Sequence, residues 1–246
     1  MSSFVFVDTE TTGIEEHDEV IQLAYVVSKD GKKTPMNKLY NPTVPISFKA
    51  MAVHNITKEM VSDKTTLDMN DVLMRGLAKM NTPDNYFVAH NAQFDIDMLG
   101  RHGFDLKMKT IDTLRCAKHL LDDAQGHSLG VIYYQYNLYK YMPELAKELG
   151  LDTGKLSAHD AMYDVMMLIL ATRMLVKVAG GDPEKLVELT QTPVLIKEFT
   201  FGKHKGSLVA DVAKKDSGYL KWMLTGMEGL DEDMKFTINT YLDGVS

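Results

Sequence analysis

Two carboxylates separated by one residue follow the first apolar stretch of the chain. Asp8 and Glu10 come at the end of a strand expected over Phe4–Asp8. Side chains two residues apart on a strand point to the same face, so both carboxylates can reach one metal ion. Residues 11–13 then form a tight polar turn. Taken alone, the pair could also be an acidic strand end that only faces solvent.

Two further carboxylates lie near predicted helix starts. Asp95 falls in the first turn of a helix expected over Ala92–His102, where the helix dipole favours a negative charge. Asp164 lies one turn into a long apolar helix expected over Asp160–Lys177, so its carboxylate needs a partner or a metal ion. His159 comes just before that helix. Simple helix capping by Asp95 and a surface role for His159 are the alternatives.

Together, these positions predict hydrolysis of a phosphodiester at a two-metal site. Four carboxylates that converge in one cleft repel one another unless divalent cations lie between them. Ligands that are all oxygen atoms favour Mg²⁺, with Mn²⁺ as a substitute. Two such ions can activate a water molecule and stabilise the leaving oxygen. His159, neutral near pH 7, is the candidate general base.

The elements that must position these residues alternate between strands and helices. Strands are expected at Phe4–Asp8, Glu19–Ser28, Met36–Tyr40, Tyr86–Ala89 and Thr110–Asp112. Helices are expected at Asp68–Met80, Ala92–His102, 113–121, 128–138, 143–149, Asp160–Lys177 and Pro183–Thr190. The first three strands form a meander, and the whole predicts an α/β domain over residues 1–180.

A different pattern follows a boundary between residues 180 and 195. From Ile196 to Trp222 the chain has six lysines against three acidic residues, with four aromatic residues interleaved. We expect a small α+β module over residues 195–246, in which Lys203 and Lys205 at a hairpin tip bind a nucleic-acid strand. The aromatic residues could instead form the small core of this module.

Composition limits the remaining possibilities. The chain has 246 residues and a net charge of −7, which argues against coating nucleic acid by charge alone. Cys116 is the only cysteine, which excludes a disulfide framework and fits a reducing, cytoplasmic setting. The longest apolar run is too short to span a bilayer, so no membrane association is expected. The sequence leaves the oligomeric state open.

The ordered motifs resemble those of a known enzyme family. Asp8-Thr-Glu10, His90-Asn-Ala-Gln-Phe-Asp95 and His159-Asp-Ala-Met-Tyr-Asp164 look like the three motifs of the DEDDh 3′→5′ exonucleases. The segment Ala50–Val61 and the tail Phe199–Trp222 resemble exodeoxyribonuclease X-like members of this family. The resemblance implies a ribonuclease H-like mixed sheet flanked by helices, with nucleoside 5′-monophosphates released from DNA 3′ ends in DNA repair.

The resemblance also implies roles for individual residues. It makes Asp8, Glu10, Asp95 and Asp164 metal ligands and His159 the general base. It implies that nucleic acid contacts Thr11, Gly13, Ile14, Met51, His54, Asn91 and Phe94. Ile14 would be an apolar wedge that frays a duplex end, although core packing is the alternative for Ile14, Met51 and Phe94. Single-stranded and duplex DNA ends are both possible substrates.

Two other functions stay open from the sequence. An exonuclease of the same family that trims RNA 3′ ends would have the same catalytic residues, because the distinction depends on contacts with the 2′-hydroxyl group. A non-catalytic, polymerase-associated module that binds nucleic acid could share the same fold. The complete set of five catalytic residue types argues against the second alternative.

Overall fold

The computed structural model describes residues 2–152, 154 and 160–244. The chain forms two compact units, Met1–Thr190 and Gln191–Ser246, which are described separately below. Among the described residues, no helix has the length and apolar character needed to cross a bilayer.

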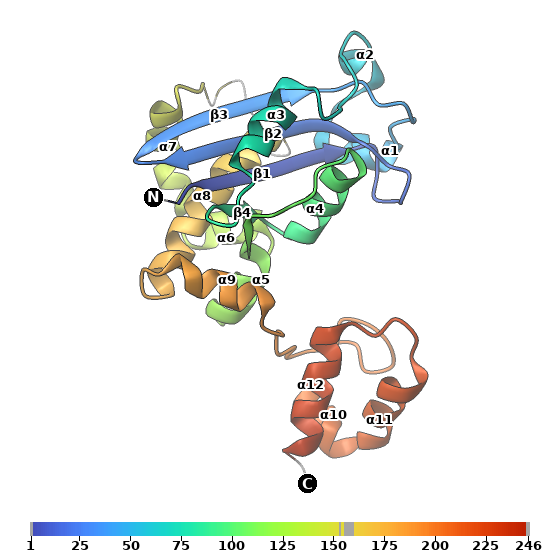
Figure 1. The fold of residues 1–246 in the computed structure, drawn as a ribbon. Helices are drawn as coiled ribbons and strands as arrows, with labels where there is room; N and C mark the ends of the chain where they lie inside the picture. Colours follow the sequence, from blue (N-terminus) through green and yellow to red (C-terminus); the bar gives the residue numbers. More distant parts are fainter. Residues whose placement is uncertain (1, 153, 155–159, 245–246) are drawn as a thin grey trace. The chain divides into compact units, whose positions relative to one another are not determined.

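The first unit is built on a mixed sheet of five strands (Figure 1). The strands are β1 (Phe4–Thr11), β2 (Val20–Lys29), β3 (Lys32–Leu39), β4 (Tyr86–Ala89) and β5 (Lys109–Asp112). Their order is β3-β2-β1-β4-β5, in which β1–β2–β3 is an antiparallel meander and β4 and β5 run parallel to β1. The predicted mixed sheet is confirmed, and β1 is longer than expected because it continues through Glu10 to Thr11.

Helices cover both faces of this sheet (Figure 1). The helices are α1 (Phe48–His54), α2 (Lys58–Val61), α3 (Val72–Met80), α4 (Ala92–Arg101), α5 (Thr113–Leu120), α6 (Leu129–Gln135), the 3₁₀ helix η1 (Leu138–Tyr141), α7 (Met142–Leu149), α8 (Ala161–Val178) and α9 (Pro183–Gln191). The sequence did not predict α1 and α2, because helices of seven and four residues are too short to show a periodic pattern.

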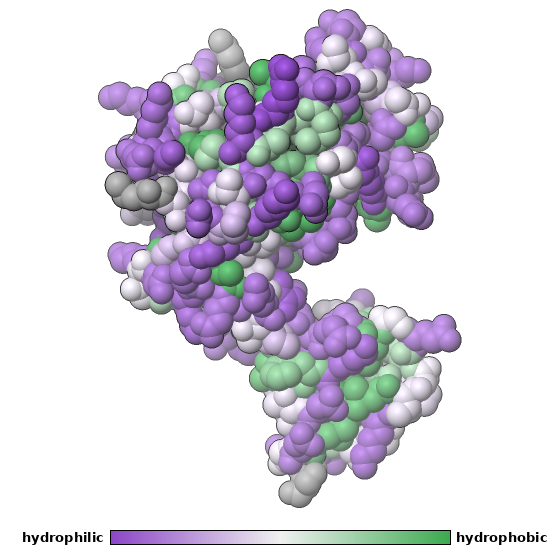
Figure 2. All heavy atoms as spheres, viewed as in Figure 1, coloured by the Kyte–Doolittle hydropathy of each residue, from purple (hydrophilic) through white to green (hydrophobic). Residues whose placement is uncertain are grey.

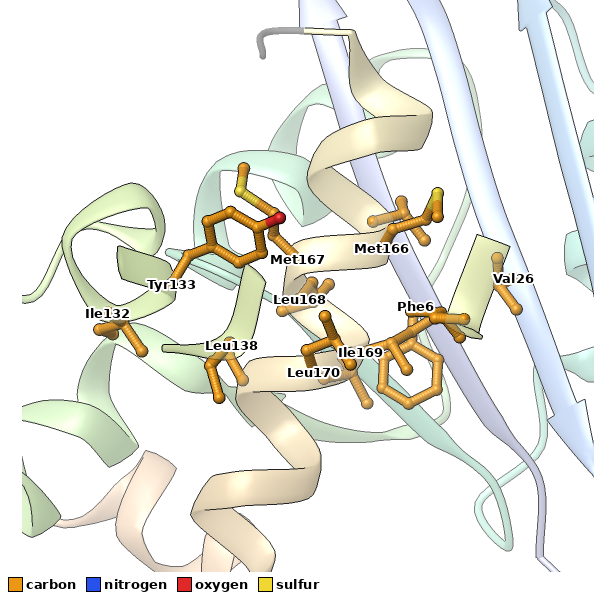
Figure 3. Packing of buried hydrophobic residues seen from close by; sticks show 14 of the residues in the cluster. Phe6, Val26, Ile132, Tyr133, Leu138, Met166, Met167, Leu168, Ile169 and Leu170 are labelled. Carbon is orange, nitrogen blue, oxygen red and sulfur yellow. The ribbon is translucent and has the colours of Figure 1, made fainter. Parts of the chain in front are cut away.

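The long helix α8 forms the centre of the larger core. Its side chains Met166, Leu168 and Ile169 are buried, and Figure 3 shows them close to Phe6 of β1 and Val26 of β2. Residues of α5, α6 and α7 complete this cluster from the other side. Because α8 is apolar around most of its circumference, it is stable only when buried in this way, which fixes its first turn against the sheet.

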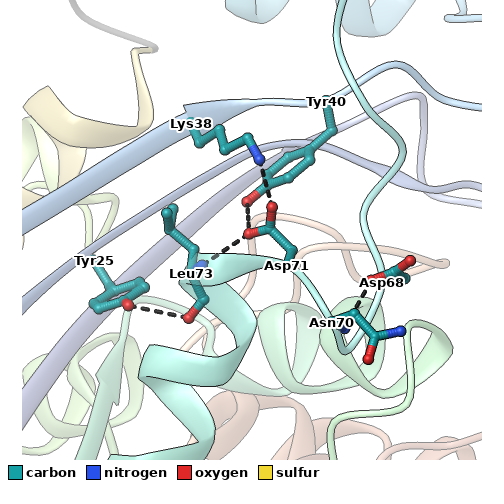
Figure 4. Close-up of polar contacts among 7 residues, drawn as sticks. All are labelled: Tyr25, Lys38, Tyr40, Asp68, Asn70, Asp71 and Leu73. Atoms are coloured by element: carbon teal, nitrogen blue, oxygen red, sulfur yellow. Dashed lines mark hydrogen bonds and ion pairs between the residues drawn. The ribbon is translucent and has the colours of Figure 1, made fainter.

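The opposite face of the sheet is covered by α3 and α4. Residues of β1 that alternate with those facing α8, such as Val5 and Val7, pack there. Polar contacts hold α3 against the sheet (Figure 4). Asp71 caps α3, accepts a hydrogen bond from the Tyr40 hydroxyl and forms an ion pair with Lys38. The Tyr25 hydroxyl donates a hydrogen bond to the Leu73 carbonyl.

The described residues of the second unit form three helices around a small core. The helices are α10 (Val209–Lys215), α11 (Ser217–Gly226) and α12 (Glu232–Asp243). An α+β module was expected, but strand pairing in the described residues is limited to one isolated bridge between Glu198 and Leu208. The turn 202–206 lies between these two residues. Phe199 is fully buried in the core, whereas Trp222 is half exposed. Figure 2 shows hydrophobic side chains between rows of hydrophilic ones on the visible face of this unit.

Candidate active site

Strand β1 presents two carboxylates on one face, as the spacing predicts. Asp8 pairs with Ala24 and Glu10 with Gln22 on the neighbouring strand, and the register shifts directly after Glu10. Thr9, between the two acids, points to the opposite face and is buried. The bulge ends the regular pairing at the point where the chain enters the turn.

Helix α8 brings the third carboxylate to this face. Oxygen atoms of Asp8, Glu10 and Asp164 all lie within 4.8 Å of one another, so these three residues could hold a metal ion. Asp160 caps α8 by accepting a hydrogen bond from the Met162 amide at 2.9 Å. The first turn of α8, which contains Asp164, is thereby fixed next to β1.

Asp95 reaches the same region from α4. The helix starts directly after Asn91, which has a left-handed backbone with φ of 68°. The Asp112 carboxylate at the end of β5 accepts hydrogen bonds from the amides of Asn91 and Ala92, at 3.0 and 3.1 Å. The Thr9 hydroxyl donates to Asp95 Oδ1 at 2.8 Å, which joins β1 to α4. Asp95 is therefore held in the first turn, as predicted.

The charges at this site repel one another. Burial, together with the nearby carboxylates Asp95 and Asp164, raises the pKa of Asp8 well above its usual range. Burial and the charge of Asp164 raise the pKa of Glu10 to about 8. Burial raises the pKa of Asp95 to about 7, although the hydrogen bond from Thr9 opposes this effect. A divalent cation between these oxygen atoms would remove the repulsion, so the donor set fits a hard metal ion.

A cavity of about 540 Å³ opens beside Glu10. Its lining includes Thr11, Gly13, Ile14, His54 and Phe94, all expected to contact nucleic acid. Ile14 is 79% exposed, which excludes the alternative of core packing for this residue. Gly13 is required by close approach, since a Cβ atom there would lie 2.4 Å from the Asp18 carboxylate.

The other predicted positions are placed differently. Met51 does not line the cavity but is partly buried against a small cluster that contains Ile21 and Ile56. Asn91 is exposed. In the second unit, Lys205 is exposed, and Lys203 forms an ion pair with Asp216 at 2.8 Å. His159, the candidate general base, lies outside the described residues.

Three residues that position the site were not predicted from the sequence. Gln22 of β2 contacts both Asp160, at 3.4 Å, and the Ala161 amide, at 3.3 Å, and so links the sheet to the start of α8. Asp18 accepts hydrogen bonds from the Thr12 hydroxyl and the Glu15 amide, which fixes the turn after β1. Asp112 caps α5 as well as supporting α4, and its place at a strand end is the only signal that could have indicated it.

His90, at the end of β4, gives the first unit a specific dependence on pH. Its Nδ1 atom lies 2.9 Å from the Thr113 hydroxyl, and burial lowers its pKa from 6.5 to about 4. The unfolded chain therefore binds a proton near pH 6.5 that the folded protein does not bind until about pH 4. As the pH falls from about 6.5 to about 4, protonation of His90 in the unfolded chain should lower the free energy of unfolding by up to about 3 kcal/mol.

The variant His90→Asn, which keeps a polar atom near Thr113, should lack this loss. Urea unfolding followed by far-ultraviolet circular dichroism at pH 4–7.5 measures both proteins. Because carboxylates also titrate in this range, the difference between the two proteins carries the result. Curves that stay parallel over the whole range would contradict the proposed titration of His90.

Comparison with known protein families assigns the class. Residues 5–172 match the family model described as "Exonuclease", and residues 199–225 match the model described as "Exodeoxyribonuclease X-like C-terminal". The chain therefore belongs to the exonuclease family.

Individual relatives extend this similarity along nearly the whole chain. Exodeoxyribonuclease 10 of Escherichia coli K12 is 32% identical over 239 residues, which are 96% of this chain and 97% of that protein. A DNA polymerase III subunit epsilon-like protein of Rhodobacter capsulatus is 30% identical over 61% of this chain and 22% of its own length. A solved structure, exonuclease X in complex with 5′ overhanging duplex DNA, is similar with a TM-score of 0.58 and 28% identity, covering 77% of this chain and 99% of the other.

Proposed function

We propose that this protein is a two-metal-ion 3′→5′ exodeoxyribonuclease that releases nucleoside 5′-monophosphates from DNA 3′ ends. The observation that carries the proposal is the convergence of Asp8, Glu10 and Asp164 within 4.8 Å in a chain that belongs to the exonuclease family. Deoxyribonucleic acid as the substrate is supported by the similarity to exodeoxyribonuclease 10 over 96% of the chain.

The four carboxylates would hold two Mg²⁺ ions, for which Mn²⁺ could substitute. Such ions supply an activated water molecule and stabilise the leaving 3′-oxygen. Asp8 and Glu10 share one face of β1, so they can hold ions jointly with Asp164. Asp95 is held near the end of β1 by the hydrogen bond from Thr9. His159 is the proposed general base, since it precedes Asp164 by five residues in the third motif, as the resemblance to the family implies.

The 3′-terminal nucleotide would occupy the cavity beside Glu10. Thr11, Gly13, Ile14, His54 and Phe94 line it. The His54 ring accepts a hydrogen bond from the Ile56 amide at Nδ1, so its Nε2 atom carries the proton and donates to the Thr11 carbonyl at 3.2 Å. His54 thus shapes the cavity wall through Thr11. Asn91 and Met51 stay candidate contacts from the sequence alone.

The two units would have different roles in the reaction. We assign the exonuclease activity to residues 1–180 and binding of the DNA strand to residues 195–246. Lys205 is exposed and Lys203 lies at the same turn, where its ammonium group is also 5.8 Å from the Tyr219 ring centre. Two lysines at one turn, of which Lys203 lies over an aromatic ring, suit a strand backbone and its bases. The proposed role is DNA repair, as the resemblance of the motifs implies, and the proposed setting is the cytoplasm, which fits a chain with a single cysteine.

Stepwise shortening of DNA tests the proposal directly. Single-stranded DNA, blunt duplex DNA and RNA of one sequence, each labelled at the 5′ end, are incubated with the protein in Mg²⁺ and in EDTA. We expect the DNA to shorten one nucleotide at a time in Mg²⁺ and to stay intact in EDTA, because the carboxylates alone cannot activate water. Faster loss from RNA would overturn the substrate, and no loss from any of the three would overturn the activity.

A further inference from the structure

Two large hydrophobic side chains stand out on the segments that form the cavity beside Glu10. Phe48 is 88% exposed and Ile14 is 79% exposed, the two highest values among large hydrophobic residues in the described part of the chain. Ile14 lines the cavity, and Phe48 lies between two residues that line it, Ser47 and Lys49. Single exposed hydrophobic residues are common, but two on the segments that form one site indicate a surface that becomes covered in use.

Phe48 is held in place by both ends of α1. The Ser47 side chain caps the helix by accepting from the Ala50 amide at 3.1 Å, and the Ser47 amide donates to the Thr12 carbonyl at 2.9 Å. At the other end, the His54 ring donates to the Thr11 carbonyl. A helix of seven residues would not persist alone, so these contacts with the end of β1 fix it. Phe48 is thereby positioned relative to the carboxylates of the same strand.

The chemistry around Phe48 fits a DNA end. Its ring is flat and apolar, as required to stack on a base, and Lys49 beside it is exposed and can approach a phosphate. Val53, one and a half turns further along α1, lines the cavity together with Ile14. An apolar edge next to a cation matches the alternation of base faces and phosphates in a strand.

We propose that Phe48 stacks on the terminal base pair of a duplex DNA end and helps to open it, so that the 3′ strand can enter the cavity. This inference rests on the proposed function. It gives Phe48 a role that is needed only when the DNA end is a duplex. Opening a terminal pair loses its stacking, and stacking on an aromatic ring offsets that loss. A single-stranded end needs no such opening, so Phe48 should matter little there.

Three DNA substrates separate this role from general binding: a single strand, a blunt duplex, and the same duplex with its last two pairs mismatched. In Phe48→Ala, we expect kcat/KM on the blunt duplex to fall about 10-fold. We expect changes below about twofold on the single strand and on the frayed duplex, which need no opening. Phe48→Trp should restore the duplex activity, and Tyr134→Ala, which removes an exposed aromatic side chain of α6 that does not line the cavity, is the matched control. The high exposure of Phe48 means that the unfolding midpoint should not change.

A second readout does not depend on hydrolysis. A duplex with 2-aminopurine at its 3′ end and phosphorothioate linkages is bound in Ca²⁺, and the fluorescence rises when that base leaves the stack. We expect the rise with the wild-type protein and not with Phe48→Ala. Equal losses on single-stranded and duplex DNA, or no loss on either, would overturn the inference. Failure of the wild-type protein to degrade single-stranded DNA would instead overturn the proposed function.

Discussion

In the variant Asp8→Asn, hydrolysis of DNA is expected to fall by at least about 1,000-fold, a loss of about 4 kcal/mol of transition-state stabilisation. A carboxylate oxygen of Asp8 lies within 4.8 Å of oxygen atoms of both Glu10 and Asp164. The Asp8 charge also interacts with that of Asp95. An amide of the same shape is a neutral and weaker ligand. The initial rate of shortening of a single-stranded oligonucleotide measures the effect.

The same substitution should raise the thermal midpoint of the metal-free protein. Burial and neighbouring carboxylates raise the pKa of Asp8, so its ionised form destabilises the folded state at pH above the usual carboxyl range. Asn resembles the neutral form and removes this cost. Adding Mg²⁺ should stabilise the wild-type protein, because the ion binds only the folded state, and should have little effect on the variant.

Asp97→Asn provides the control for this experiment. Asp97 is on α4, two residues from Asp95, but its side chain is exposed and contacts Gln93 at 2.7 Å. This variant should keep wild-type activity and the Mg²⁺ response. If Asp8→Asn lost activity together with a lower midpoint, the loss would indicate misfolding. Retained activity would remove Asp8 from the metal site.

The second large effect is expected in the core of the second unit. Phe199 is fully buried among residues of α10, α11 and α12, and Phe199→Ala should cost about 3–5 kcal/mol. A folded unit of this length holds a total of roughly 3–8 kcal/mol. We therefore expect the second unit to unfold in this variant while the first unit stays folded.

Trp222 reports this event without interference. It is the only tryptophan of the chain and lies on α11, so its fluorescence follows the second unit alone. Affinity for single-stranded DNA should fall by at least about 10-fold, and the slope of log K against log salt should become shallower by about 0.7 for each phosphate group that the protein no longer neutralises. Hydrolysis of a chromogenic ester of thymidine 5′-monophosphate should not change, because we propose that the first unit alone carries the exonuclease activity.

Phe236→Ala is the matched control in the same unit. Phe236 is on α12 but is 40% exposed, so the same chemical change removes much less packing. This variant should keep the Trp222 signal and the affinity for DNA. An unfolded second unit with undiminished affinity and an unchanged salt slope would show that the unit does not bind the strand.

The sequence by itself determined which carboxylates are the candidate metal ligands. The spacing of Asp8 and Glu10 places both on one face of a strand, because side chains alternate with a period of two. Asp95 and Asp164 occupy the first turns of α4 and α8 as predicted, since the local pattern of capping and apolar residues defines where a helix starts. The meander and the mixed sheet also followed from local patterns.

The second unit shows where local patterns are insufficient. The sequence predicted an α+β module with a hairpin tip around Lys203 and Lys205, yet the described residues form helices from Val209 onward and pair as strands only at one isolated bridge. Packing of a small core decided the outcome over local preference. Similarly, α1 exists because the end of β1 holds both of its ends, which no periodic pattern within seven residues could reveal.

Only the tertiary structure decided how the carboxylates meet and what holds them. Gln22 joins β2 to α8 across a separation of 138 residues, and Asp112 joins β5 to α4 across 21. Such contacts form between side chains that are distant in sequence and leave no periodic or spacing signal. The sequence therefore determined which residues could bind metal ions, whereas the packing of α8 and α4 on opposite faces of one sheet determined that their carboxylates lie together at the end of β1.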